Sequence, residues 1–116
     1  MEENKSHSAA HVSAGTACLP LRIPQNHPAL PGHFPGRPLV PGVVLLDRVL
    51  AAARHWLGCD VRLRVLQQAK FAAPLLPEQD SQIELKLQDG ELRFAITRDG
   101  VTIAQGSMNV VLGAGA

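Results

Sequence analysis

A segment crowded with proline and glycine, residues 27–42, constrains this chain more than any other feature. Five prolines and three glycines fall within these sixteen residues. Because proline fixes φ and removes a backbone donor, neither a helix nor a regular strand can run through the segment. Its apolar residues and its position inside a chain of 116 residues predict a stiff, shaped loop rather than a flexible linker.

An almost wholly apolar run follows this loop. Residues 42–57 place valine, leucine and alanine on nearly every side of a helix, and Gly58 supplies a stop signal. A helix that is apolar nearly all round is typically buried. We therefore expect the other elements to wrap around it.

The rest of the chain alternates apolar and polar residues, which is typical of strands. Such runs occupy residues 61–65, 83–87 and 92–96, with a further strand after Gly100. We expect a short strand at residues 17–23, which Pro20 would confine to a sheet edge.

Two Asp-Gly pairs, at 89–90 and 99–100, separate the last three runs and favour tight hairpin turns. Gly106 shifts the phase of the final strand, which predicts a bulge there. We expect an α+β fold in which a curled antiparallel sheet surrounds one helix.

Length and charge limit the classes of function. The length predicts one domain, residues 17–112, with a mobile leader at 1–16 and a flexible tail at 113–116. A net charge of +1 and an aromatic content of 3% exclude a surface that wraps nucleic acid or stacks on bases. Residues 22–70 hold seven basic and two acidic side chains. They form either an ordinary solvated surface or a basic rim for an acidic partner.

Cysteine content and hydropathy indicate the compartment. Cys18 and Cys59 have no metal-type spacing, and no signal peptide precedes them, so we expect free thiols in a cytoplasmic protein. No apolar run reaches the roughly 20 residues that a membrane-spanning helix needs. His27 lies six residues before His33, but no further ligands stand at suitable spacing, so we expect no metal.

Three residues carry the strongest chemical signal: His33 in the loop, Gly42 at the helix start and Asp47 in its second turn. A histidine base, a carboxylic acid and a free amide are what is needed to remove a proton beside a thioester carbonyl and expel a neighbouring hydroxyl. Structural roles stay open. His33 is also interpretable as a loop histidine, and Asp47 as a partner of Arg48 or Arg54 or as part of a solvated helix edge.

The sequence Gly-His-Phe-Pro-Gly-Arg-Pro-Leu-Val-Pro-Gly-Val-Val-Leu-Leu-Asp, residues 32–47, resembles the active-site loop and helix of the hot-dog-fold 3-hydroxyacyl-[acyl carrier protein] dehydratases of the FabA/FabZ type. Residues 70–77 and 98–106 resemble the strand after that helix and the last hairpin. The lead-in His-Pro-Ala-Leu-Pro-Gly resembles the small ApeI-like dehydratases associated with aryl polyene synthesis.

The resemblance implies roles for individual residues. His33 would take the C2 proton, Asp47 would help the C3 hydroxyl to leave, and the amides of Gly42 and Val43 would polarise the thioester carbonyl. The acyl chain, on the phosphopantetheine arm of an acyl carrier protein, would lie in an apolar tunnel, and no other cofactor is implied. Tunnel candidates are Phe34, Leu45, Leu46, Leu50 and Phe71.

The resemblance also implies partners. A homodimer, or an oligomer of dimers, would bring His33 of one chain to Asp47 of the other. The acidic carrier protein or its phosphate would meet basic side chains. Our candidates for that contact are Arg37, Arg54, Arg62 and Arg64.

Two departures from the family pattern stand out. The acid is Asp47, as in the isomerising branch, whereas the Phe-Pro-Gly-Arg-Pro loop is similar to the other branch, so isomerisation stays open. Ala51 replaces the glutamine that commonly braces the acid one turn further on. A hot-dog thioesterase and a non-catalytic acyl-binding subunit remain the alternatives. Acyl chain length and the identity of the carrier are not determined by these residues.

Overall fold

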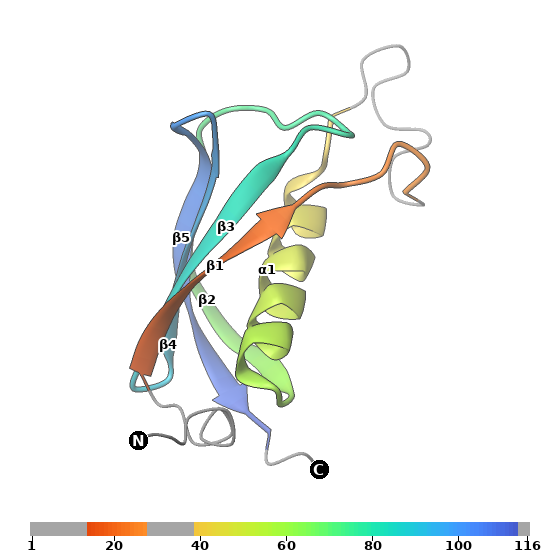
Figure 1. The fold of residues 1–116 in the computed structure, drawn as a ribbon. Helices are drawn as coiled ribbons and strands as arrows, with labels where there is room; N and C mark the ends of the chain where they lie inside the picture. Colours follow the sequence, from red (N-terminus) through yellow and green to blue (C-terminus); the bar gives the residue numbers. More distant parts are fainter. Residues whose placement is uncertain (1–13, 28–38, 114–116) are drawn as a thin grey trace.

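The computed structural model describes residues 14–27 and 39–113. Its elements are β1 Ala14–Leu21, α1 Gly42–Leu57, β2 Val61–Phe71, β3 Ser81–Gln88, β4 Glu91–Arg98 and β5 Val101–Leu112. The strands form one antiparallel sheet in the order β1-β3-β4-β5-β2, and the helix lies along one face of it (Figure 1). The predicted α+β architecture, a curled sheet and one helix, is confirmed.

Several predictions fall on residues outside the described ranges. They concern the leader up to residue 13, the tail from residue 114, and the loop residues His33, Phe34 and Arg37. The domain limits at 17 and 112 stay predictions.

The helix has the ends that the sequence predicts. Pro41, with ψ of 148°, lies outside the helical region, and its carbonyl accepts from the amides of Val44 at 3.0 Å and Leu45 at 3.3 Å. At the other end Gly58 has φ of 70°, and its amide donates to the carbonyl of Arg54 at 2.8 Å. Glycine takes this left-handed conformation at little cost because it has no Cβ.

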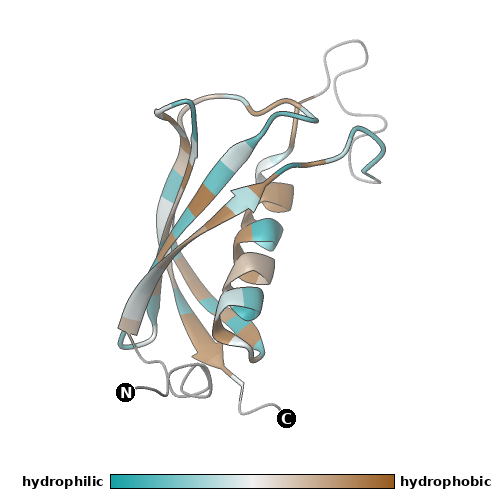
Figure 2. Cartoon of the chain, viewed as in Figure 1, coloured by the Kyte–Doolittle hydropathy of each residue, from teal (hydrophilic) through white to brown (hydrophobic). Residues whose placement is uncertain are grey.

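The expectation that the helix is buried on nearly all sides is wrong for a single chain. Val49, Ala53 and Leu57 face the sheet and are at most 1% exposed, whereas Val43 is 72% exposed. Asp47 is also exposed. Figure 2 shows hydrophilic as well as hydrophobic turns on the outer side of α1. The physical reason is that a single sheet covers only one side of a cylinder.

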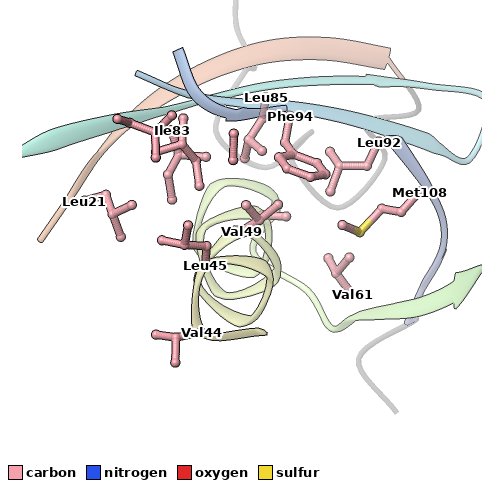
Figure 3. Packing of buried hydrophobic residues seen from close by; sticks show 14 of the residues in the cluster. Leu21, Val44, Leu45, Val49, Val61, Ile83, Leu85, Leu92, Phe94 and Met108 are labelled. Atoms are coloured by element: carbon pink, nitrogen blue, oxygen red, sulfur yellow. The ribbon is translucent and has the colours of Figure 1, made fainter. Parts of the chain in front are cut away.

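The core lies between the helix and the centre of the sheet. Figure 3, a view along the helix, shows Val49 and Leu45 of α1 facing Leu85, Phe94 and Met108 of the sheet. Each of these five side chains is at most 4% exposed. Burial of this apolar surface is the main term that holds α1 against the sheet.

Both Asp-Gly turns are confirmed. Asp89 and Gly90 have φ of 51° and 80°, and Asp99 and Gly100 have φ of 52° and 78°. Two successive positive φ values match the type I′ turn, whose twist suits adjacent antiparallel strands. The turns join β3, β4 and β5 into the predicted meander.

Strand β1 lies at the sheet edge as predicted, but its bounds differ. It spans Ala14–Leu21 rather than residues 17–23, because it pairs along the whole of β3, from Ala14 opposite Gln88 to Leu21 opposite Ser81. Pro20 is tolerated because its missing donor lies on an edge strand. Ile23 lies beyond the residues of β1 that pair with β3, and it is fully buried.

The predicted bulge at Gly106 is wrong. Gly106 pairs in register with Phe94 on one side and Ala69 on the other, and the irregularity between β4 and β5 falls at Ile103. Gly106 has a steric role instead, since a Cβ there would lie 2.8 Å from the Phe94 ring and 2.3 Å from the carbonyl oxygen of Gln68. The glycine therefore makes room for an aromatic ring in the core.

Candidate active site

The start of α1 presents two free backbone donors. The amides of Gly42 and Val43 have no acceptor within residues 14–27 and 39–113, and no side chain caps the helix. These N–H groups lie at the positive end of the helix dipole, where they are able to bind a carbonyl oxygen. The structure thus leaves both amides available, and their contact with a thioester carbonyl stays a prediction.

The ring of Phe71 packs directly on Gly42. A Cβ at Gly42 would lie 2.8 Å from Cζ of Phe71, closer than carbon atoms approach one another. Phe71 is the last residue of β2 and pairs with Ala104, on the helix side of the sheet. The close approach of this aromatic ring therefore favours glycine at this position.

An apolar groove of about 520 Å³ opens beside this contact. Three predicted tunnel residues line it: Leu45, Leu46 and Phe71. Leu50 does not line the groove; it is partly buried against the core. The sequence interpretation missed the second wall, which is formed by Leu39, Val40, Ala72, Ala73, Pro74 and Leu75.

A larger hollow of about 780 Å³ lies elsewhere, on the outer face of the sheet. Its lining mixes charged and polar side chains from all five strands and includes no residue of α1. The smaller groove is the better candidate for an acyl chain, because its lining is apolar and it opens at the free amides of the helix start.

Asp47 is exposed on the outer side of α1. Its carboxylate has no ion pair or hydrogen bond with a described residue, so the pairing with Arg48 or Arg54 that was weighed as an alternative is not present. The burial expected for the whole helix does not extend to Asp47 in a single chain, because the sheet packs against the opposite side of the helix. The solvated helix edge, weighed as an alternative, describes Asp47 within one chain.

Two of the candidate arginines share one carboxylate. Asp60 lies 2.7 Å from Nε of Arg62 and 3.5 Å from Nε of Arg54, which also donates to the carbonyl of Val61 at 3.1 Å. The hydrogen bond from Arg62, assisted by the charges of Arg62 and Arg54, holds the pKa of Asp60 below its ordinary value of 3.8. These two arginines hold together the end of α1 and the start of β2.

Arg64 departs from the expected alternation along β2. The register passes from Leu63 opposite Val110 directly to Val65 opposite Asn109, so Arg64 is the extra residue of a bulge. It is exposed and forms no ion pair with a described residue. Arg62 keeps the expected outward position opposite exposed Val111.

The described ranges contain no cluster of metal ligands, no disulfide and no membrane-spanning helix. No three side chains of histidine, cysteine, aspartate or glutamate there come together as metal ligands do. Cys18 and Cys59 are free thiols, as predicted. Among these residues no helix has the length and apolar character to cross a membrane.

Comparison with known proteins identifies the family. A family model described as ApeI dehydratase, ApeI-like, matches residues 8–107. The chain belongs to the ApeI-like dehydratase family. The match includes the loop with His33, the helix start and Asp47.

This ApeI-like chain is also similar in sequence to proteins that are named as dehydratases. It is 35% identical over 95 residues to the 3-hydroxyacyl-[acyl-carrier-protein] dehydratase FabZ of Haemophilus influenzae, covering 74% of this chain and 63% of that protein. It is 26% identical over 98 residues to FabZ of Herpetosiphon aurantiacus, covering 74% and 70%. The chain thus spans roughly two thirds of the length of these two FabZ proteins.

Solved structures agree on the fold. The dehydratase heterocomplex ApeI:P from Xenorhabdus doucetiae matches with a TM-score of 0.74 and 26% identity, over 85% of this chain and 88% of that one. An uncharacterized protein from Erwinia carotovora subsp. atroseptica, 24% identical, matches with a TM-score of 0.70 over 87% and 86%. The predicted hot-dog fold is confirmed. The family is one of dehydratases, hydro-lyases, and neither the thioesterase nor the non-catalytic subunit is favoured.

Proposed function

We propose that this ApeI-like chain removes water from a 3-hydroxyacyl thioester held on an acyl carrier protein and leaves the trans-2-enoyl thioester. One observation supports this most strongly: an apolar groove opens at a helix start with two free amides, on the helix that also carries Asp47. In this proposal the acyl chain lies in the groove, and the thioester carbonyl accepts from Gly42 and Val43.

The proposed reaction divides the work among three groups. The amides draw electron density from the carbonyl, which makes the C2 proton more acidic, and His33 removes that proton. The electron pair forms the C2–C3 double bond while the C3–oxygen bond breaks, and Asp47 gives its proton to the departing hydroxyl. Proton transfer from His33 back to Asp47 then restores both groups.

The position of Asp47 suits a group that acts near the carbonyl. It lies five residues beyond Gly42, about 7.5 Å along the helix axis. Helical side chains lean toward the helix start, which reduces this separation. Ala51 lies one turn further on and carries no polar atom to hold the carboxylate.

We propose that a second copy of the chain completes the site. Edge strand β2 leaves Leu63 and Leu66 on its helix side 44% and 39% exposed, and Val43, at the start of α1, is 72% exposed. Large apolar side chains on an open sheet edge favour association with another chain. A dimer formed there would bring His33 of one chain to Asp47 of its partner and cover the outer side of α1.

We propose that the acidic carrier protein docks on the arginines near the start of β2. Arg64 is the strongest candidate, because it is exposed without an ion pair to a described residue. Arg54 and Arg62 share Asp60, so part of their charge is already neutralised. Arg37, which lies outside the described residues, remains a candidate from the sequence alone.

The biosynthetic setting belongs to the same proposal. Fatty acid synthesis is the setting that the FabZ relatives support, and an aryl-polyene-type chain is the narrower proposal, supported by the ApeI-like match. A cytoplasmic location is consistent with the two free thiols.

The test is a direct assay. The purified chain is incubated with a 3-hydroxyacyl thioester of pantetheine or of a carrier protein, and the enoyl product is followed by its absorbance and by mass spectrometry. We expect enoyl formation by the wild type and a loss of at least a hundredfold in His33→Ala and in Asp47→Asn. Release of free thiol would show a thioesterase. Equal inactivity of wild type and variants, with the acyl chain still bound, would show a non-catalytic subunit.

A further inference from the structure

The two ends of the segment that carries His33 are held by one short stretch, residues 75–78. On one side the amide of Val40 donates to the carbonyl of Leu75 at 2.9 Å. On the other side the amide of Glu78 donates to the carbonyl of Ile23 at 2.8 Å. Residues 75–78 therefore hold the chain just before and just after the segment in which His33 lies.

Glu78 has an unusual backbone for its residue type. Its φ is 68°, and the other described non-glycine residues with positive φ are Asp89 and Asp99. Those two open tight hairpin turns, where aspartate is common. Glutamate has no such preference, and its Cβ makes the left-handed conformation unfavourable. A residue keeps such a conformation only where its surroundings hold it there.

The contacts of the Glu78 side chain stabilise this backbone conformation. Its carboxylate accepts from the amide of Gln25 at 2.8 Å and pairs with the guanidinium of Arg22 at 2.7 Å. Together with the backbone bond to Ile23, Glu78 thus contacts three of the four residues from 22 to 25. Arg22 and Glu78 are 58% and 44% exposed, so the ion pair contributes little to global stability. Its main effect is on the local course of residues 22–25.

We propose that Glu78 is a positioning residue for His33: it fixes the segment Arg22–Gln25, from which the chain enters the His33 segment. The proposal rests on the proposed function, in which His33 is the base. Glu78 itself touches no reacting atom. A base held at the wrong distance from C2 loses much of its effect, because proton transfer depends steeply on geometry.

The variant Glu78→Gly tests this with little cost to folding. Glycine relieves the positive φ, which offsets the greater freedom of the unfolded chain, so we expect the midpoint of thermal unfolding to stay within about 3 °C of wild type. We expect kcat for dehydration to fall about tenfold, with KM unchanged since Glu78 does not line the groove. Asp89→Gly is the matched control: it also relieves a positive φ, in the turn between β3 and β4, and should leave kcat unchanged.

Arg22→Met tests the ion pair between Arg22 and Glu78 by changing its other partner. It should lower kcat in the same direction but less, because it leaves the hydrogen bond from Gln25 to Glu78 in place. Glu78→Gly combined with Arg22→Met should be no slower than Glu78→Gly alone, because both changes remove the ion pair between Arg22 and Glu78, and the other pair of Arg22, with Asp80 at 3.9 Å, is exposed. Hydrogen exchange at the Gln25 amide should accelerate in Glu78→Gly and stay at the wild-type rate in Asp89→Gly.

A measurement without turnover separates this proposal from the proposed function. The imidazole C–H resonances of His33, assigned through His33→Ala, should shift or broaden in Glu78→Gly and stay unchanged in Asp89→Gly. If the wild type forms no enoyl product, the proposed function fails and these resonances alone decide whether Glu78 positions His33. Unchanged kcat and resonances in Glu78→Gly would overturn the positioning role, as would an equal fall of kcat in Asp89→Gly.

Discussion

The two sides of α1 differ in what they contribute. The side toward the sheet holds Val49, Ala53 and Leu57, each at most 1% exposed and packed into the core. The outer side holds exposed Val43 and Asp47, which contribute little to the stability of a single chain. The same helix thus stabilises the fold with one side and exposes an apolar side chain and a carboxylate on the other. In the proposed function, association and chemistry depend on the second side.

Asp47→Asn, on the outer side of α1, should give the largest effect, and this effect should be on activity and not on stability. We expect the rate of enoyl formation to fall about a thousandfold, within the usual range for loss of a general acid. The free energy of unfolding should change by less than about 0.5 kcal/mol, because the carboxylate is exposed and has no described partner. Steady-state kinetics and urea unfolding measure the two quantities. A stability loss comparable to that of a core variant would contradict the comparison.

Leu57→Ala, on the side of α1 that faces the sheet, should lower stability and leave the catalytic rate of the folded chain unchanged. Removing this buried side chain should lower the free energy of unfolding by about 3 kcal/mol, through lost apolar burial and the cavity left behind. Urea unfolding measures it, with Val101→Ala as the control because Val101 is 54% exposed. The fraction still folded should keep its kcat. Equal effects of the two variants would show that Leu57 is not part of the core.

Leu66→Asp extends the comparison to the open edge at β2. A charge at this 39% exposed apolar position should weaken self-association at least tenfold, because it would have to be desolvated in the interface. Sedimentation equilibrium measures the dissociation constant. Val111→Asp is the control, since Val111 pairs with Arg62 on the outer face of the sheet. A wild type that stays monomeric at micromolar concentration would refute the shared site.

The smallest effect concerns Asp60, where the end of α1 meets β2. Since its pKa is lowered in the folded chain, chiefly by the hydrogen bond from Arg62, its ionised form stabilises the fold above about pH 4. That contribution is lost as the pH falls below this value and the carboxylate is protonated. Asp60→Asn should therefore make stability less dependent on pH on the acid side. Thermal unfolding between pH 3 and pH 7 measures it, and curves of equal slope would contradict the assignment.

Elements with local signals were predicted well. The helix has the predicted bounds because Pro41 and Gly58 act on the backbone within one turn. The turns at Asp89 and Asp99 follow from residues that accept a positive φ. By contrast, the extent of β1 and the bulges at Arg64 and Ile103 depend on the strands beside them, which no local pattern specifies.

The candidate site was predicted in part for the same reason. Gly42, Leu45, Leu46 and Phe71, all named from the sequence, line one groove, since three of them share one helical stretch. The wall at residues 72–75 was missed, although its apolar run with Pro74 was a visible signal. Glu78 carried no sequence signal, because its role depends on contacts with residues more than fifty positions away.

The sequence by itself determined the helix and the tight turns and supplied the candidate residues for the chemistry, because proline, glycine and hydrophobic periodicity act over a few neighbouring residues. Only the tertiary structure decided which side of α1 is covered, which sheet edge stays open, and how Glu78 holds residues 22–25. These outcomes depend on pairings across long stretches of chain. Whether a group such as Asp47 is buried is settled by the surface that packs against it, and not by its neighbours in sequence.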